Sequence, residues 1–171
     1  MPKRVERISV FFDAYHKASI EEARYLYVEL VDQLVDLVNQ HPKIGPFLKE
    51  NPFPSKGAGI FLSFQKGVGD YYLDGSISTI SQGRGDKLYY STAEKRKILH
   101  QAILGLDGLP EGEDEWVEKV QFIDFMEEPY EEAARIVHEQ QAQNQVVFQV
   151  TPSSLPESPG MWKRFTQFIG F

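Results

Sequence analysis

The sequence predicts an α+β fold, with an antiparallel sheet of about five strands and a long N-terminal helix and two shorter helices packed mainly on one face. Two changes of pattern support this. Before His41, apolar residues recur at helical spacing, whereas residues 57 to 91 are rich in Gly, Tyr, Ser and β-branched residues that alternate with a period of two. Helical patterns then return, separated by two further strand-like runs.

The strongest helical pattern begins at Ser19. Residues 19 to 22 (Ser-Ile-Glu-Glu) fit a capping box, in which the Ser hydroxyl accepts from a first-turn amide and Glu22 reaches back to the cap. An apolar stripe follows on one side, and His41-Pro42 ends the pattern. Residues 5 to 16 fit either element. We expect a helix there, with a strand over residues 8 to 12 as the alternative.

Three strands are predicted in the Gly- and Tyr-rich block. Residues 60 to 64 alternate onto one face, and residues 71 to 81 form a second run that Asp74-Gly75 interrupts as a hairpin turn or a bulge. Residues 83 to 86 turn the chain before a third strand at residues 87 to 90. The economical arrangement of these three strands is an antiparallel meander.

The remaining elements are predicted from caps and periodicity. Residues 91 to 94 (Ser-Thr-Ala-Glu) fit a second capping box, which predicts a helix through Leu104. Residues 116 to 126 carry apolar side chains on both faces, which is typical of a central strand. Pro129 suits the start of a helix ending near residue 143, and residues 146 to 150 alternate as a last strand.

The predicted organisation is one α+β domain over residues 1–151, a Pro/Ser linker over 152–160 and a short aromatic amphipathic tail over 161–171. The tail has three interpretations: docking on its own domain, binding a partner groove or subunit, or lying on a membrane surface. Its short length and its two basic residues weaken the membrane interpretation. Contact with a membrane surface is therefore expected only through this tail.

Composition excludes several classes of function. The formal net charge of −7 argues against binding to duplex nucleic acid, which requires clustered Lys and Arg. The absence of cysteine excludes disulfides, a thiol nucleophile and cysteine-ligated metals. No apolar run is long enough to span a membrane, and no signal peptide follows Met1. The default location is cytoplasmic, or exported if Met1 replaces a removed leader.

No motif predicts a cofactor or a metal. The glycine pairs at residues 57 to 59 and 67 to 69 lack the third glycine of a dinucleotide fingerprint and lead into strands. The four histidines are far apart in the sequence, without metal-ligand spacing. These glycines are therefore interpreted as shaping turns and bulges.

A small hydrolase-like enzyme is the alternative function. Asp70, Asp74 and Asp86 lie at predicted turns where two carboxylates could meet, and serines near His100 or His138 could complete a triad in space. Asp beside Gly is also ordinary turn chemistry, and no nucleophile-elbow motif is present. An enzyme would show a concave pocket with perturbed titratable groups.

A protein-binding or assembly module without enzymatic activity is the function we expect, acting on a protein partner or by self-association. Tyr71-Tyr72 and Tyr89-Tyr90 lie on predicted neighbouring strands, and each pair puts one ring on either face. Amphipathic rings among Ser and Thr suit a binding surface, although cross-strand packing explains them as well. The candidate binding residues are Tyr72, Tyr89, Arg84, Trp162, Phe165 and Phe168. Arg84 belongs to an Arg-Gly-Asp tripeptide of the kind that integrin ligands display.

Overall fold

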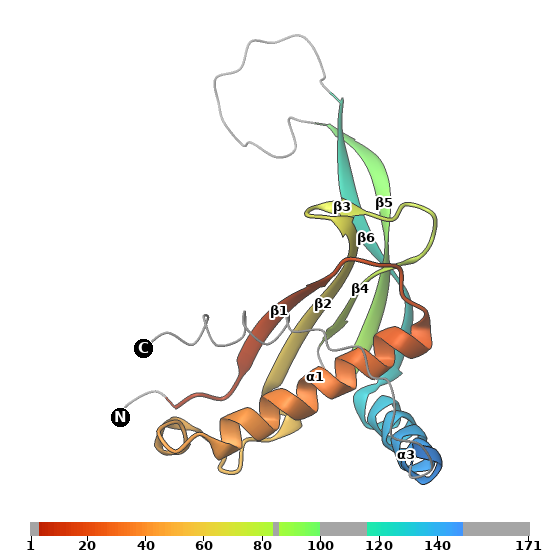
Figure 1. Ribbon diagram of the computed structural model, residues 1–171. Coiled ribbons are helices and arrows are strands. Elements are labelled where there is room, and N and C mark those ends of the chain that lie inside the picture. Colours follow the sequence, from red (N-terminus) through yellow and green to blue (C-terminus); the bar gives the residue numbers. More distant parts are fainter. Residues whose placement is uncertain (1–3, 84–85, 100–115, 149–171) are drawn as a thin grey trace, which may run out of the picture. The chain divides into compact units, whose positions relative to one another are not determined.

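The computed structural model describes residues 4–83, 86–99 and 116–148 and shows a mixed six-stranded sheet with two α-helices (Figure 1). The chain divides into two compact units, residues 1–137 and 138–171, and the sheet lies in the first. The elements in chain order are β1 (Ile8–Ala14), α1 (Ile20–Gln40), the 3-10 turns η1 (Gly45–Phe47) and η2 (Ser55–Gly57), β2 (Ala58–Gly67), β3 (Asp70–Tyr71), β4 (Ile77–Gln82), β5 (Lys87–Leu99), β6 (Trp116–Pro129) and α3 (Tyr130–Phe148).

The strand order is β1-β2-β4-β5-β6, and β3 pairs with the far end of β2. β1 runs parallel to β2, from Ile8 opposite Ala58 to Ala14 opposite Phe64, whereas every other pairing between the named strands is antiparallel. The prediction of an antiparallel sheet is therefore wrong for β1. The reason is the intervening helix, because a strand–helix–strand crossover returns the chain to run in the same direction.

The helix α1 is the second element, since β1 precedes it. Ser19 is extended and caps the helix, with its Oγ accepting from the Glu22 amide at 3.1 Å. The Glu22 carboxylate does not complete the predicted box but bonds to His16 Nε2 at 2.9 Å. The prediction of a helix over residues 5 to 16 is wrong, because Ile8, Val10 and Phe12 alternate toward the core as β1.

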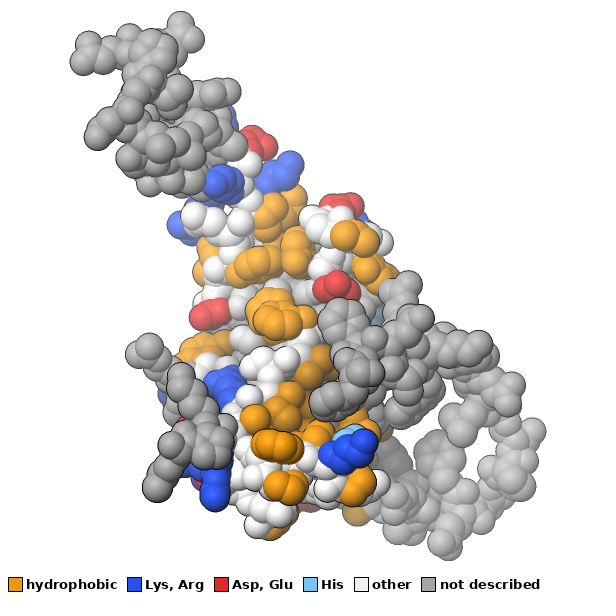
Figure 2. All heavy atoms as spheres, turned by 90° about the vertical axis from the view of Figure 1, so that its left-hand side faces the viewer, with side chains coloured by type: hydrophobic (Ala, Val, Ile, Leu, Met, Phe, Trp, Pro, Cys, Tyr) orange, Lys and Arg blue, Asp and Glu red, His pale blue; other side chains and the backbone are white. Residues whose placement is uncertain are grey.

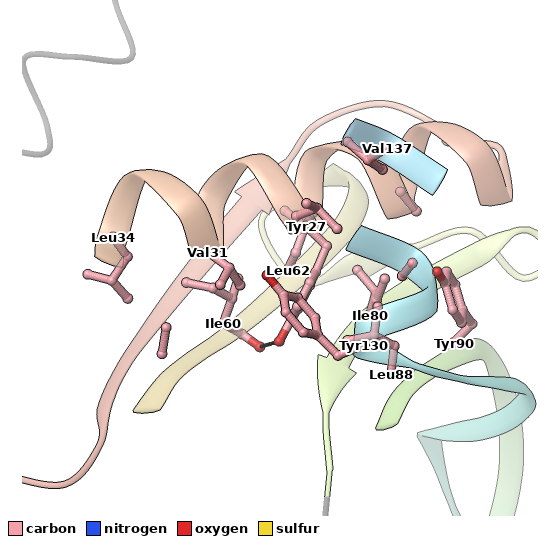
Figure 3. Packing of buried hydrophobic residues seen from close by; sticks show 14 of the residues in the cluster. Tyr27, Val31, Leu34, Ile60, Leu62, Ile80, Leu88, Tyr90, Tyr130 and Val137 are labelled. Atoms are coloured by element: carbon pink, nitrogen blue, oxygen red, sulfur yellow. Dashed lines mark hydrogen bonds between the residues drawn. The ribbon is translucent and has the colours of Figure 1, made fainter. Parts of the chain in front are cut away.

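The hydrophobic core lies between α1 and one face of the sheet (Figure 3). Tyr27 and Val31 of α1 are fully buried against strand residues that include Ile60 and Ile80. The Tyr27 hydroxyl donates to the Ile60 carbonyl at 3.3 Å. Tyr130, Ala133 and Val137 bring the first part of α3 into the same core. Burial raises the pKa of Tyr27 and of Tyr130.

A partly buried polar group ties α1 to β6. Arg24 donates two hydrogen bonds to Glu128, and the Tyr90 hydroxyl donates to the same carboxylate. The side chains of Arg24 and Glu128 are 15% and 13% exposed. Glu128 thereby raises the pKa of Arg24, while burial followed by the Glu128 hydrogen bond raises the pKa of Tyr90.

The helix predicted from residue 91 through Leu104 is wrong where the structure describes it, because β5 continues to Leu99. The hydroxyl of Ser91 bonds to Asp124 on β6 rather than to an amide in its own segment. The Ala93 amide bonds to the Ser78 hydroxyl of the neighbouring strand. Pairing with β4 and β6 therefore overrides the local capping signal.

Two further predictions near the C-terminal end are wrong. β6 was expected to be central but lies at one end of the described strand order, next to β5 alone. The apolar residues on both faces of β6 are not a sign of burial, because Val120, Phe122 and Phe125 are each at least 40% exposed. Residues 146 and 148 belong to α3 rather than to a last strand. No helix in the described part of the chain is long and apolar enough to cross a membrane.

Candidate binding face

The face of the sheet opposite α1, called the open face below, carries a row of aromatic side chains. In β1, Ser9, Phe11 and Asp13 point away from the core-facing residues. The strand register then leads across the sheet from Phe11 to Phe61, Ser81, Tyr89 and Glu127. The Phe11 and Phe61 rings lie 5.7 Å apart, and Phe11 is 76% exposed. Phe11, Phe61 and Tyr89 form what we call the aromatic row.

Two glycines allow long side chains to lie close to the open face. A Cβ at Gly83 would lie 2.4 Å from the Tyr89 ring, so only glycine leaves space for the ring in this position. A Cβ at Gly59 would similarly lie 2.7 Å from Arg7 Nε. The Arg7 guanidinium reaches across to donate to the Gln82 carbonyl at 3.4 Å. The glycines thus fix where an aromatic ring and a cation lie on this face.

A second row of side chains lies next to the aromatic row on the same face, two residues away along β1, β2, β4 and β5. It consists of hydroxyl and carboxylate side chains. We call it the hydroxyl row, and in strand order it is Asp13, Ser63, Thr79, Ser91 and Asp124. Its three hydroxyl residues are at most 5% exposed, whereas the two terminal aspartates are exposed.

Each terminal aspartate of the hydroxyl row accepts a hydrogen bond from its neighbour. Ser63 Oγ donates to Asp13, which also accepts from Gln65 Nε2 at 2.8 Å. Ser91 Oγ donates to Asp124 at 2.5 Å. Within the described residues, neither aspartate has a Lys, Arg or His ion-pair partner. The row therefore holds two oriented carboxylates without neutralising cations.

A second pair of rings lies beyond the hydroxyl row. Tyr71, opposite Gln65 on β2, packs edge-to-face on Phe122 of β6 with ring centroids 4.9 Å apart. Ala93, the β5 residue opposite Phe122, is small and buried. Phe125 is the extra residue of a bulge between Asp124 and Met126 and is 47% exposed. Figure 2, which views the molecule from the left-hand side of Figure 1, shows hydrophobic side chains gathered in a band with charged ones mostly beside it.

The sequence-predicted binding residues are placed differently from one another. Tyr89 lies half-buried in the aromatic row, and its neighbour Tyr90 is fully buried in the core. Tyr72 lies between β3 and β4, with its ring 5.1 Å from Lys17 Nζ and 5.4 Å from Lys66 Nζ. Tyr71, rather than Tyr72, pairs with a ring of the open face. Arg84, Trp162, Phe165 and Phe168 lie outside the described residues.

Sequence reasoning missed most of the residues of the open face. Phe11 and Asp13 belong to the segment that was expected to be helical, and the strand alternative for residues 8 to 12 was the signal that would have found Phe11. Phe61 alternates with Ile60 and Leu62, so its position on the opposite face was available from the strand pattern. Phe122 and Asp124 depend on the register between β5 and β6, which the sequence does not indicate.

The carboxylates expected at the turns do not meet in the structure. Asp74 pairs with Lys17 at 2.5 Å, and this bond, followed by those from Ser76, lowers the pKa of Asp74. Asp86 accepts from Gln82 at 3.2 Å, while Asp70 lies 4.0 Å from Lys66. Each of the three carboxylates therefore has a different partner.

The described part of the chain shows no cluster of metal ligands, and the hollow found there has paired charges on its rim. No group of three His, Asp or Glu side chains there is arranged to hold a metal ion. His16 bonds to Glu22, and His41 accepts from the Lys43 amide. A hollow of about 250 Å³ near Arg7 and Phe53 is rimmed by ion pairs, Lys49 with Glu6 and Lys56 with Glu50. Four of the charged side chains of the rim are thus paired with one another.

Comparisons with protein-family models, with curated proteins and with solved structures found no match. No activity or ligand is therefore suggested by a relative. The inference of function depends on the side chains of the open face.

Proposed function

We propose that this chain is a non-enzymatic module that binds a protein partner on the open face of its sheet. The observation that carries the proposal is the exposure of Phe11 and Phe122, 76% and 44%, at opposite sides of a face that α1 does not cover. Exposed rings rimmed by polar groups are typical of protein interfaces, where aromatic anchors supply much of the binding energy.

The open face is held in place before a partner arrives. Tyr89 lies over Gly83, Tyr71 packs on Phe122, and the aspartate at each end of the hydroxyl row accepts from the serine of the neighbouring strand. A surface whose side chains are already positioned loses less conformational entropy on binding than a surface of free rotamers. The geometry therefore favours recognition by a fixed surface.

A protein partner suits this face better than a nucleic acid. Proteins that bind single strands on aromatic rings also use a positively charged groove to follow the phosphates. The open face has exposed carboxylates at Asp13 and Asp124, and Lys87 is paired with Glu127 at 2.5 Å. With a formal net charge of −7, the chain would repel a phosphate backbone.

The experiment compares capture of partners from lysate of the source cells by three forms of the full chain. The Phe11→Thr/Phe122→Thr double variant removes two exposed rings while keeping β-propensity. Tyr25→Ala, the control, removes a 41% exposed ring on α1 and keeps helix propensity. We expect partners bound by the wild-type chain to fall about tenfold or more with the double variant, since interface rings contribute upward of ~1 kcal/mol each.

The control variant decides how the result is interpreted. Partners that Tyr25→Ala retains and the double variant loses support the open face. Partners retained equally by all three forms would contradict the proposal. Self-association belongs to the same test, because sedimentation of the purified chains shows whether the captured partner is a second copy.

A further inference from the structure

The charges of the open face indicate what kind of protein it binds, an inference that rests on the proposed function. Asp13 and Asp124 end the hydroxyl row on its two outermost strands, β1 and β6. Both carboxylates are exposed and, in the described ranges, have hydroxyl or amide donors but no cation. A carboxylate with donors on one side only has acceptor capacity left for a further donor.

Three other charged side chains lie near the aromatic row. Lys87 and Glu127 neutralise each other at 2.5 Å. Arg7 lies over Gly59, one residue pair beyond the aromatic row, and donates to the Gln82 carbonyl. Arg7 keeps its positive charge, but the charged residues next to Phe11 and Phe122 on their own strands are Asp13 and Asp124. Charge complementarity favours a partner with positive charge at both positions.

The strand spacing sets the distance between these positions. The strand order places four inter-strand gaps between β1 and β6. With gaps of about 4.8 Å, the Cα atoms of Asp13 and Asp124 lie about 19 Å apart. Each carboxylate leans inward and accepts from the serine of the neighbouring strand. The hydroxyls between them are buried and, for Ser63 and Ser91, already donate to the aspartates. The surface available between the two charges is thus mainly that of the flanking rings.

We propose that the open face recognises a basic protein partner that presents an apolar patch between two Lys or Arg side chains, spaced to reach the carboxylates of the two outermost strands. The apolar patch covers Phe11, Phe61 and Phe122, and the two cations contact Asp13 and Asp124. Arg suits each aspartate best, because its planar fork donates two hydrogen bonds to a carboxylate.

The test uses random peptides displayed on phage and selected on the wild-type full chain at low salt. Selected peptides are then synthesised with a fluorophore, and their Kd values are measured for four chains: the wild type, the Asp13→Asn/Asp124→Asn double variant, the Phe11→Thr/Phe122→Thr double variant and Asp36→Asn. Asn keeps the acceptor for the Ser hydroxyl and removes the charge. Asp36 is exposed on α1, so Asp36→Asn controls for the loss of net charge.

We expect ring-dependent peptides to be enriched in separated pairs of Lys or Arg. Each Asp→Asn change at the face should weaken their binding about 3- to 5-fold, and the double change about 10- to 25-fold, because charge pairs this far apart act independently. Asp36→Asn should leave Kd unchanged. High salt should reduce the effect of the face variants.

Three results would overturn the inference, and they differ in whether they also contradict the proposed function. Peptides that need the rings but bind the Asp13→Asn/Asp124→Asn chain as tightly as the wild type would leave the proposed function intact and remove the basic partner. Peptides that bind the Phe11→Thr/Phe122→Thr chain as tightly as the wild type would contradict the proposed function as well. Selection of no ring-dependent peptide would also contradict both.

Discussion

Arg24 of α1 and Glu128 of β6 are joined by two parallel hydrogen bonds, Nε to Oε1 at 2.8 Å and Nη2 to Oε2 at 3.0 Å. Their sequence separation of 104 residues makes this pair a long-range tie between the helix and an outermost strand of the sheet. The Tyr90 hydroxyl adds a third donor to the same carboxylate. The alignment of α1 on the core face therefore depends on one polar group as well as on apolar packing.

Loss of Arg24 should destabilise the fold measurably. In Arg24→Met, Glu128 loses both guanidinium donors and keeps the Tyr90 hydroxyl, while its side chain is 13% exposed. We expect the free energy of unfolding to fall by about 2 kcal/mol, less than for a fully buried pair because both side chains retain some solvent contact. Urea titration followed by circular dichroism measures this change.

The exposed pair Lys87–Glu127 provides the matched control for Arg24→Met. Its side chains are 44% and 50% exposed, so solvent screens the attraction. Lys87→Met should leave the urea midpoint nearly unchanged. Equal destabilisation by Arg24→Met and Lys87→Met would show that the tie between α1 and β6 has no special role.

Alkaline pH should destabilise the fold through three tyrosines. Burial raises the pKa values of Tyr27, Tyr90 and Tyr130 above their value in the unfolded chain. A group whose pKa is raised on folding contributes its full stabilisation below the unfolded pKa, about 10 for tyrosine. The free energy of unfolding should therefore be constant up to about pH 10 and fall above it.

Tyrosine absorbance measured together with circular dichroism tests this expectation. Tyr27, Tyr90 and Tyr130 should ionise only as the fold is lost. Ionisation of these three tyrosines while the circular dichroism spectrum stays native is the contrary result.

Gly83 should tolerate no side chain while Tyr89 is present. An added Cβ lies 2.4 Å from the Tyr89 ring, so Gly83→Ala must displace the ring at a cost of about 1–3 kcal/mol. At Gly67, where nothing lies within 4 Å of an added Cβ, the same change should cost less than about 0.5 kcal/mol. Thermal melts compare the two variants.

A double-mutant cycle isolates the contact between Gly83 and Tyr89. In a Tyr89→Ala background the clash is gone, so Gly83→Ala should cost much less than in the wild-type chain. The same cost in both backgrounds would show that the ring does not lie over Gly83.

Local signals in the sequence predicted some elements well. The Ser19 hydroxyl caps α1 as predicted. The apolar face predicted for the helix is also the one it buries, with Tyr27 and Val31 in the core. The alternation of Ile60, Leu62 and Phe64 places these residues in the core as β2. In both cases the periodicity of the segment agrees with the burial that the fold gives it.

Long-range pairing accounts for what could not be predicted. The Ser91 hydroxyl can cap a helix or bond across a strand, and only the presence of Asp124 on β6 decides between these roles. Residues 8 to 12 fit a helix or a strand by themselves, and pairing with β2, which is distant in the sequence, decides in favour of the strand. The hydroxyl row depends on four separate registers, so no single segment of the sequence contains it.

The most direct test of the binding face is site-specific photo-crosslinking in the source cells. A photoreactive phenylalanine analogue replaces Phe11, Phe122 or, as the control, Tyr25 of α1. We predict the same crosslinked protein from Phe11 and Phe122 and none from Tyr25. Equal crosslinking of that protein from Tyr25, or no crosslink from either face position, would contradict the assignment of the open face as the partner-binding surface.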